Sequence, residues 1–248
     1  MNAAVDQIVN NAERDDQSRS LLHLLLAAKD KEGDDRTLTA LELRAECKTF
    51  LMAGHETTST WVYWTMYALA KTPDLQERLY QRIVEHASDI SQEVTLEEVE
   101  RMDYLRAVLQ EVLRLYPPVG MMTRVNTYPE TFAGYHVPAD TRLVLPMHLL
   151  HRHSKYWDEA ESFRPERWIN VSDKERERRR FAFLPFSAGG HNCIGQRFAM
   201  LEAQLIVAPL VREFCIQIAP SQRQVTHTFV PSATMKAKPA LRIVVKLR

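Results

Sequence analysis

The 248-residue sequence predicts one mainly helical domain with a small β portion. The first reason is a long helical stretch that opens at Thr39, where Glu42 completes a capping box, and that Pro73 stops. The second is a change of pattern after Pro118. From there, short apolar runs are separated by residues that break regular structure, namely Gly134, Pro138 and Pro146.

The helices are expected in the first half of the chain. A leucine-rich helical stretch (20–29) and a charged loop (30–36) precede Thr39. The helix from Thr39 to Lys71 would be about 48 Å long. Pro73 then takes the first position of the next helix, a place that suits proline. Asp103 is expected to cap a third helix, which ends before Pro117-Pro118 and whose buried face is Leu105, Val108, Leu109, Val112 and Leu113.

The second half predicts a small sheet and one further helix. Short runs at 121–125 and 141–147 are expected to be strands, followed by an aperiodic region at 156–185 that includes the charged run 174–180. A helix should follow Cys193 and kink or end at Pro209, because proline removes a backbone hydrogen bond. Strands are expected at 216–219 and 241–246.

The bulk composition excludes several classes of protein. Lys+Arg and Asp+Glu both count 32, so nothing indicates a nucleic-acid partner. Three widely spaced cysteines form neither a disulfide framework nor a zinc pattern, which fits a reducing compartment. No apolar stretch is as long as a membrane span, and the first 16 residues lack the apolar core of a signal peptide.

The chemistry is concentrated in the run Phe186-Ser187-Ala188-Gly189-Gly190-His191-Asn192-Cys193-Ile194-Gly195. It places a cysteine in a tight glycine-containing loop just before a helix, where backbone N–H groups favour a thiolate. A thiolate so presented is a metal ligand, and on haem iron it favours O–O bond cleavage. The alternative is a buried structural cysteine in a turn, which is the usual place of a free cysteine.

The segment resembles the haem-binding loop of the cytochrome P-450 family, Phe-x-x-Gly-x-x-x-Cys-x-Gly, at Phe186, Gly189, Cys193 and Gly195. Three more motifs of that family occur in the family's order: Ala53-Gly54-His55-Glu56-Thr57-Thr58, Glu111-Val112-Leu113-Arg114 and Phe163-Arg164-Pro165-Glu166-Arg167-Trp168. The resemblance extends from about residue 21 to the C-terminus.

The resemblance implies the C-terminal half of the cytochrome P-450 fold, with residues 1–248 as a partial domain that lacks the N-terminal half and any membrane anchor. It implies haem b held by Cys193, and a monooxygenase that inserts one oxygen atom from O2 into a hydrophobic organic substrate. The electrons would come from an NAD(P)H-dependent reductase or a ferredoxin-type donor, for which run 174–180 is a candidate docking face. The expected location is the cytoplasmic side. The alternatives are peroxide rearrangement without O2, or a truncated, non-catalytic remnant or interaction fragment whose apolar faces are exposed.

The resemblance also implies roles for residues of the long helix. Ala53 and Gly54 would form a notch against which a flat cofactor lies, and the glycine is otherwise unfavourable there. Glu56 and Thr57 would relay protons to oxygen bound at the haem iron. The alternative is a kinked helix with solvent-facing polar residues. A zinc-hydrolase motif is rejected because position 59 is a serine.

Glu111 and Arg114 lie three residues apart, on one face of a helix, and can pair. The resemblance implies that both meet Arg167 in a buried charge cluster whose role is positional. The alternative is an ordinary surface ion pair.

The remaining assignments are implied by position in the family. Arg124 and His191 would bind the haem propionates. Substrate contacts are expected from Val119, Gly120, Met121 and Met122 and from the late pair Thr234 and Met235, although their side chains suit an ordinary core equally well. His148, His151 and His153 are expected to be structural or solvent-facing.

Overall fold

The computed structural model describes residues 39–87, 92–222, 224–228 and 234–248. The chain falls into two units, the first ending at Glu56 and the second running from Thr57 to Arg248. The predicted leucine-rich stretch and charged loop before Thr39 lie outside the described residues.

The long helix is present as predicted. α3 (Ala40–Lys71) has 32 residues and includes Gly54 without a break in the helix. Its capping box forms, because the Glu42 carboxylate accepts from the Thr39 N–H at 2.8 Å while the Thr39 hydroxyl accepts from the Glu42 N–H at 3.3 Å. The second helix, α4 (Pro73–His86), starts at the predicted proline.

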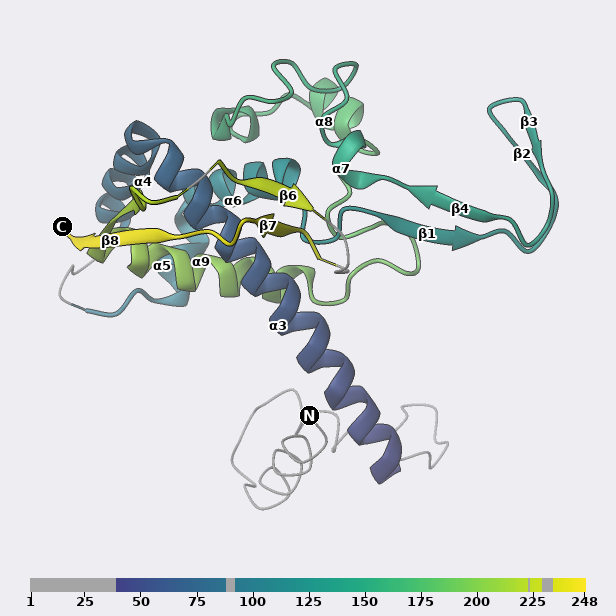
Figure 1. Ribbon diagram of the computed structural model, residues 1–248, viewed down its shortest axis with the longest axis horizontal. Helices are drawn as coiled ribbons and strands as arrows, with labels where there is room; N and C mark the ends of the chain where they lie inside the picture. The colour runs from purple at the N-terminus through teal and green to yellow at the C-terminus, as the bar shows by residue number, and fades with distance from the viewer. Residues whose placement is uncertain (1–38, 88–91, 223, 229–233) are drawn as a thin grey trace. The chain divides into compact units, whose positions relative to one another are not determined.

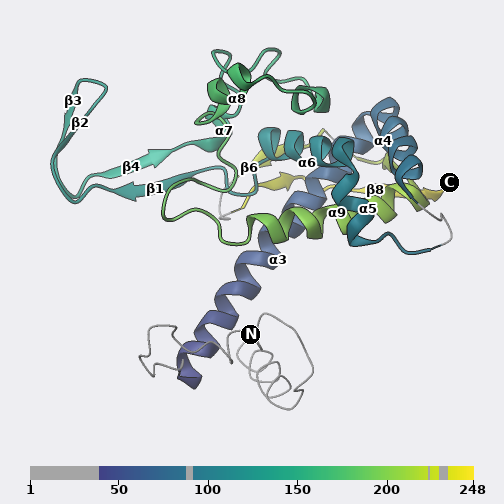
Figure 2. The ribbon, with the colours of Figure 1, turned by 180° about the vertical axis from the view of Figure 1, so that it is seen from behind.

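The core of the second unit is helical. α9 (Gln196–Glu213) packs with α4, α5 (Leu96–Arg101) and α6 (Asp103–Leu115), and α4 also packs with α6; these helices lie side by side in both ribbon views (Figures 1 and 2). α6 buries almost its whole circumference, with Leu105, Val108, Leu109 and Val112 fully covered. Burial of each such side chain contributes about 1.5–3 kcal/mol to the stability of the fold, so α6 is held firmly in the core.

Four two-stranded antiparallel sheets occur in the part of the chain that the structure describes. β1 (Met122–Val125) pairs with β4 (Arg142–Leu145), and the chain between them forms the hairpin of β2 (Glu130–Phe132) and β3 (Tyr135–Val137) (Figure 1). β5 (Phe214–Ile218) pairs with β8 (Ile243–Leu247), and β6 (Thr226–Thr228) pairs with β7 (Lys236–Lys238). A small β portion beside the helices is therefore confirmed.

Several predicted boundaries were wrong. Asp103 is the first residue of α6 and not its cap; Met102 takes that position and makes no side-chain capping bond. The run 141–147 ends as α7 (Met147–Leu150) after its strand. α9 continues through Pro209 to Glu213, where buried Val207, Ala208 and Val211 hold the helix in place across the missing hydrogen bond.

The region 156–185 contains two short helices that its sequence pattern did not predict. η1 is the 3₁₀ turn Pro165–Trp168, and α8 is Asp173–Arg179, capped by the Ser172 hydroxyl. α8 has no apolar residues and hence no apolar period. Its turns are joined instead by ion pairs, such as those of Glu175 with Arg178 and Arg179.

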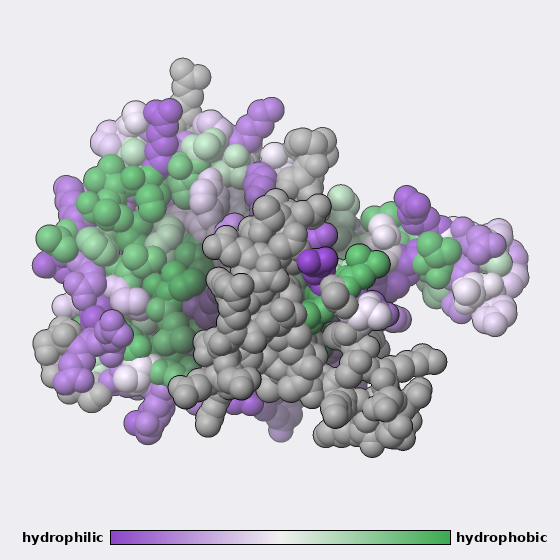
Figure 3. Space-filling view, turned by 90° about the horizontal axis from the view of Figure 1, so that it is seen from below, coloured by the Kyte–Doolittle hydropathy of each residue, from purple (hydrophilic) through white to green (hydrophobic). Residues whose placement is uncertain are grey.

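Apolar side chains also gather on one face of the molecule (Figure 3). All five residues of β8 are exposed, including four apolar ones: Ile243, Val244, Val245 and Leu247. The sheet that β8 forms with β5 is thus not fully covered by the rest of the described chain.

Candidate functional site

The cysteine loop leads directly into α9. Ser187 and Gly189 adopt positive φ angles of 65° and 81°, which turn the backbone back on itself. The Cys193 N–H donates to the Phe186 carbonyl at 2.8 Å, closing the loop two residues before Gly195, the N-cap of α9. The predicted turn and helix start are both present.

Cys193 is an exposed residue. Of the three free cysteines, Cys47 is buried, Cys215 is half-buried and Cys193 is exposed. A Cβ added at Gly189 or Gly190 would meet no atom within 4 Å. The structure therefore presents one accessible sulfur in a loop with room around it, and the alternative of a buried structural cysteine is wrong for Cys193.

Phe186 fixes the base of the loop. Its ring lies edge-to-face with Trp61, 6.0 Å between centroids, and the Trp61 indole N–H donates to the Leu109 carbonyl at 3.0 Å. Trp61 belongs to the part of α3 within the second unit, and Leu109 to α6. The loop is thus tied through one aromatic pair to two helices of the core.

Arg124 approaches the loop from β1. Its Nη2 donates to the Ser187 hydroxyl at 3.2 Å and its Nη1 to the Thr123 carbonyl at 2.9 Å, while the residue as a whole is exposed. His191 is exposed within the loop, two residues before Cys193. The structure brings Arg124 and His191 to the same loop as the thiol; that they bind propionates stays a prediction.

A buried carboxylate organises the region behind the loop. Both oxygens of Glu111 are fully buried and accept from Arg114, at 2.8 and 3.0 Å, while Oε1 also accepts from Arg167 at 2.9 Å. Two more donors complete the set: the backbone N–H of Arg164 at 2.9 Å and the indole N–H of Trp168 at 2.8 Å. The structure brings Glu111, Arg114 and Arg167 together inside the protein, and the surface-pair alternative is wrong.

One functional candidate was missed in the sequence. His151 is fully buried, its carbonyl accepts from Arg114 Nη1 at 3.0 Å, and its ring Nε2 accepts from the Leu184 N–H at 3.0 Å. It is one of three nearby histidines, with His148 and His153, in a stretch without an apolar period, so the sequence pattern did not distinguish it from the exposed His153.

The α3 motif is divided between the two units. Ala53, Gly54 and Glu56 belong to the first unit, and Thr57 opens the second. Ala53 and Gly54 are exposed, Glu56 and Thr57 are half-buried, and a Cβ at Gly54 would meet nothing within 4 Å. Their proposed roles beside a cofactor stay predictions.

The predicted substrate residues have different environments. Met121 is exposed, and Val119 and Met122 are half-buried. Met235 is fully buried in the core, where its carbonyl accepts from the Trp64 indole and its N–H donates to the Pro118 carbonyl. The packing of Met235 is that of a core residue, and a substrate role for all four remains a prediction.

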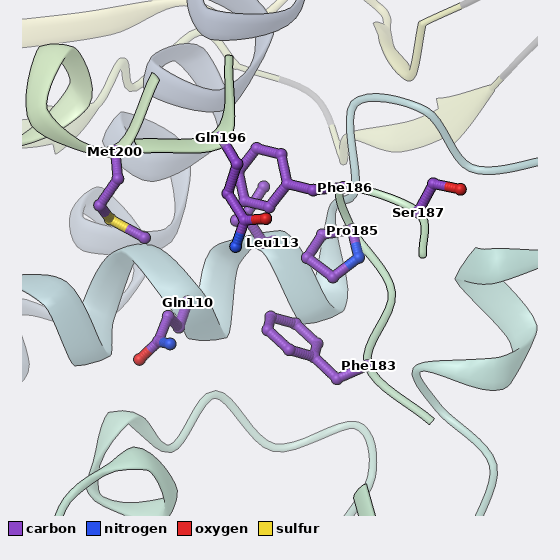
Figure 4. Close-up of a pocket in the computed structure, with 8 residues that line it drawn as sticks. All are labelled: Gln110, Leu113, Phe183, Pro185, Phe186, Ser187, Gln196 and Met200. Carbon is purple, nitrogen blue, oxygen red and sulfur yellow. The ribbon is translucent and has the colours of Figure 1, made fainter. Parts of the chain in front are cut away.

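A small cavity lies beside the loop (Figure 4). Its volume of about 110 Å³ is well below the roughly 300–1,000 Å³ of small-molecule sites, so it does not hold a substrate by itself. α6, α9 and the segment before Cys193 all contribute to its lining: Gln110, Leu113, Phe183, Pro185, Phe186, Ser187, Gln196 and Met200.

Among the described residues, no group of three or more His, Cys, Asp or Glu side chains could hold a metal ion. Within the same residues, no helix has both the length and the hydropathy needed to cross a membrane.

The loop fits a haem. The group is an apolar plate with an iron atom and two carboxylates; the loop has an exposed cysteine, and Arg124 from β1 and His191 of the loop are polar side chains beside it. Residues that follow the thiol are apolar and exposed, with Ile194 88% and Phe198 71% accessible. These features are those expected of a haem-thiolate protein.

The comparisons with known proteins show the family. The model of the cytochrome P450 family matches residues 1–244. The chain is 35% identical over 199 residues to cytochrome P450 4V2 of Mus musculus and 33% identical over 237 residues to cytochrome P450 4B1 of Homo sapiens. These matches cover 80% and 95% of this chain, but 37% and 45% of those proteins. The chain belongs to the cytochrome P450 family, a family of haem monooxygenases, and spans less than half the length of these relatives.

Proposed function

We propose that this chain carries the haem-thiolate portion of a monooxygenase that inserts one oxygen atom from O2 into a hydrophobic organic substrate. The observation that carries the proposal is the accessible thiol of Cys193, held in a closed loop at the start of α9. Haem with an axial thiolate supplies the chemistry of O–O bond cleavage.

Each candidate residue has a task in this proposal. Cys193 binds the iron through its sulfur, and Phe186 holds the loop against the core. Arg124 and His191 bind the two propionates. Thr57 passes protons toward the oxygen site, and Glu56 replenishes them from water.

The proposed partners are O2, a hydrophobic substrate, and an NAD(P)H-dependent reductase or ferredoxin-type electron donor. The reaction would take place on the cytoplasmic side. α8 is a less favourable docking surface than its sequence indicated, because Arg176, Arg178, Arg179 and Arg180 all pair with acidic side chains nearby.

The test is the reduced, CO-bound absorption spectrum of the haem-loaded chain. Cys193→Ala should abolish the thiolate-type spectrum, while Cys47→Ala and Cys215→Ala, as matched controls, should retain it. A thiolate-type spectrum in the Cys193 variant would move the ligand to another cysteine and overturn the assignment.

A further inference from the structure

We propose that His151 is a positioning residue that connects the buried Glu111–Arg114 pair to the backbone of the cysteine loop. The inference deepens the proposed function and rests on it for its meaning, although its contacts are independent of haem. It concerns a histidine that the sequence pattern left without a role.

His151 is held from both sides. Its carbonyl accepts from Arg114 Nη1 at 3.0 Å, and Arg114 in turn binds Glu111 through two nitrogens. Its ring Nε2 accepts from the Leu184 N–H at 3.0 Å, and the ring lies 5.3 Å from that of Phe183. One residue therefore joins the end of α6 to the segment that leads to Cys193.

The connection continues into the loop through the backbone. The Leu184 carbonyl accepts from the Ser187 N–H at 3.1 Å, and the Phe186 carbonyl accepts from the Cys193 N–H at 2.8 Å. Leu184 is thus fixed at both its N–H and its carbonyl, two residues before the loop closes on itself. Moving Leu184 would move the base of the loop that presents the sulfur.

The ring nitrogens indicate a specific role for this imidazole. Because Nε2 accepts, the proton must be on Nδ1, which is buried and makes no hydrogen bond of good geometry, although the backbone of Leu113 and Arg114 interacts with the ring. A buried donor without a well-placed acceptor destabilises the folded chain, so a side chain that only filled space would be better apolar. Burial also lowers the pKa of His151 to about 3, which keeps the ring neutral and Nε2 an acceptor at neutral pH.

The test compares two variants of the full chain without haem. His151→Leu fills the space but cannot accept from Leu184, whereas His151→Gln offers an amide oxygen near the position of Nε2. Amide hydrogen exchange at Leu184 and the rate of alkylation of Cys193 by a small maleimide are measured, with Cys215 as an internal reference. Exposed His136→Leu on β3 is the control for loss of a histidine.

We expect His151→Leu to speed Leu184 exchange by about tenfold or more, and to change the Cys193 rate with Cys215 unaffected. His151→Gln should restore both to near wild type. The inference is overturned if His151→Leu leaves both unchanged, or if His151→Gln behaves like it. Should His151→Leu fail to fold, the glutamine variant decides alone: wild-type values support the inference and altered values refute it. Absence of a thiolate-type spectrum in the haem-loaded wild type would refute the proposed function while leaving these readouts intact.

Discussion

Replacing Glu111 should destabilise the protein far more than replacing any surface carboxylate. In Glu111→Ala, Arg114 and Arg167 lose their common counter-ion, while their remaining partners are backbone carbonyls such as those of His151 and Asp158. Breaking a buried ion pair from one side costs about 3–5 kcal/mol, because a buried charge is left uncompensated. That is a large fraction of the roughly 5–15 kcal/mol by which an ordinary globular domain is stabilised.

Glu111→Gln removes the negative charge but keeps the size and shape of the side chain, so it separates the contribution of the charge from that of the shape. The amide keeps one acceptor oxygen but turns an NH2 group toward donors, the Trp168 indole and the Arg114 guanidinium among them. We expect Glu111→Gln to cost about 2 kcal/mol or more, since those donors are buried without an acceptor.

The assay is urea unfolding at neutral pH, with haem uptake measured in parallel. With a slope of about 1–3 kcal/mol per molar urea, Glu111→Ala should lower the midpoint by about 1 M or more and abolish haem incorporation. The matched control is Glu85→Ala, which removes an exposed ion pair with Arg82 at 2.9 Å and should cost less than about 1 kcal/mol. Equal midpoints for the two variants, or stable haem-loaded Glu111→Ala, would refute the reasoning.

Three other predictions concern separate parts of the chain. Burial lowers the pKa of His151 from 6.5 to about 3, so below pH 6.5 the unfolded chain binds a proton that the folded chain excludes. Between about pH 8 and pH 5, the free energy of unfolding of the wild type should therefore fall by about 2 kcal/mol more than that of His151→Gln, as measured by urea unfolding at each pH. Thr57→Ala, in a chain extended to the length of its relatives, should retain haem but divert electrons to peroxide or water; unchanged coupling of electron use to product would remove Thr57 from the mechanism. Buried Gln76 forms hydrogen bonds with the Leu69 carbonyl and with both the N–H and the carbonyl of Ile216. Gln76→Leu should therefore lower the free energy of unfolding, measured by urea, by about 1–3 kcal/mol, whereas Gln81→Leu at an exposed position should leave it almost unchanged.

The helices that could be predicted are those whose signals are local. α3 and α4 were recognised because a capping box and a proline mark their starts, and α6 because its apolar residues repeat at helical spacing. α8 lacked such a repeat, and α5 has only six residues, too few for a period to be visible. At Pro209, where the helix was expected to kink or end, α9 does not end, because its packing against the core outweighs the local effect of the proline.

The site shows the same division between local and tertiary signals. The turn around Gly189 and the exposure of Cys193 follow from residues within ten positions of each other, so the motif alone predicts them. The role of His151 depends on an N–H that lies 33 residues later in the chain, at Leu184. No spacing rule links the two positions, and only the folded chain shows the contact.

Three contacts from distant elements determine where the cysteine loop lies. Trp61 on α3 meets Phe186, Arg124 on β1 meets Ser187, and His151 after α7 meets Leu184. Within the second unit, each contact engages a different residue of the span 184–187, which leads into the loop and forms its start, so the span cannot shift without breaking at least one of them. The motif thus specifies the shape of the loop, whereas its position depends on side chains outside the motif. A cysteine that must bind the iron of a rigid plate requires both, and a variant that keeps residues 186–195 intact should still lose the cofactor if these contacts are removed together.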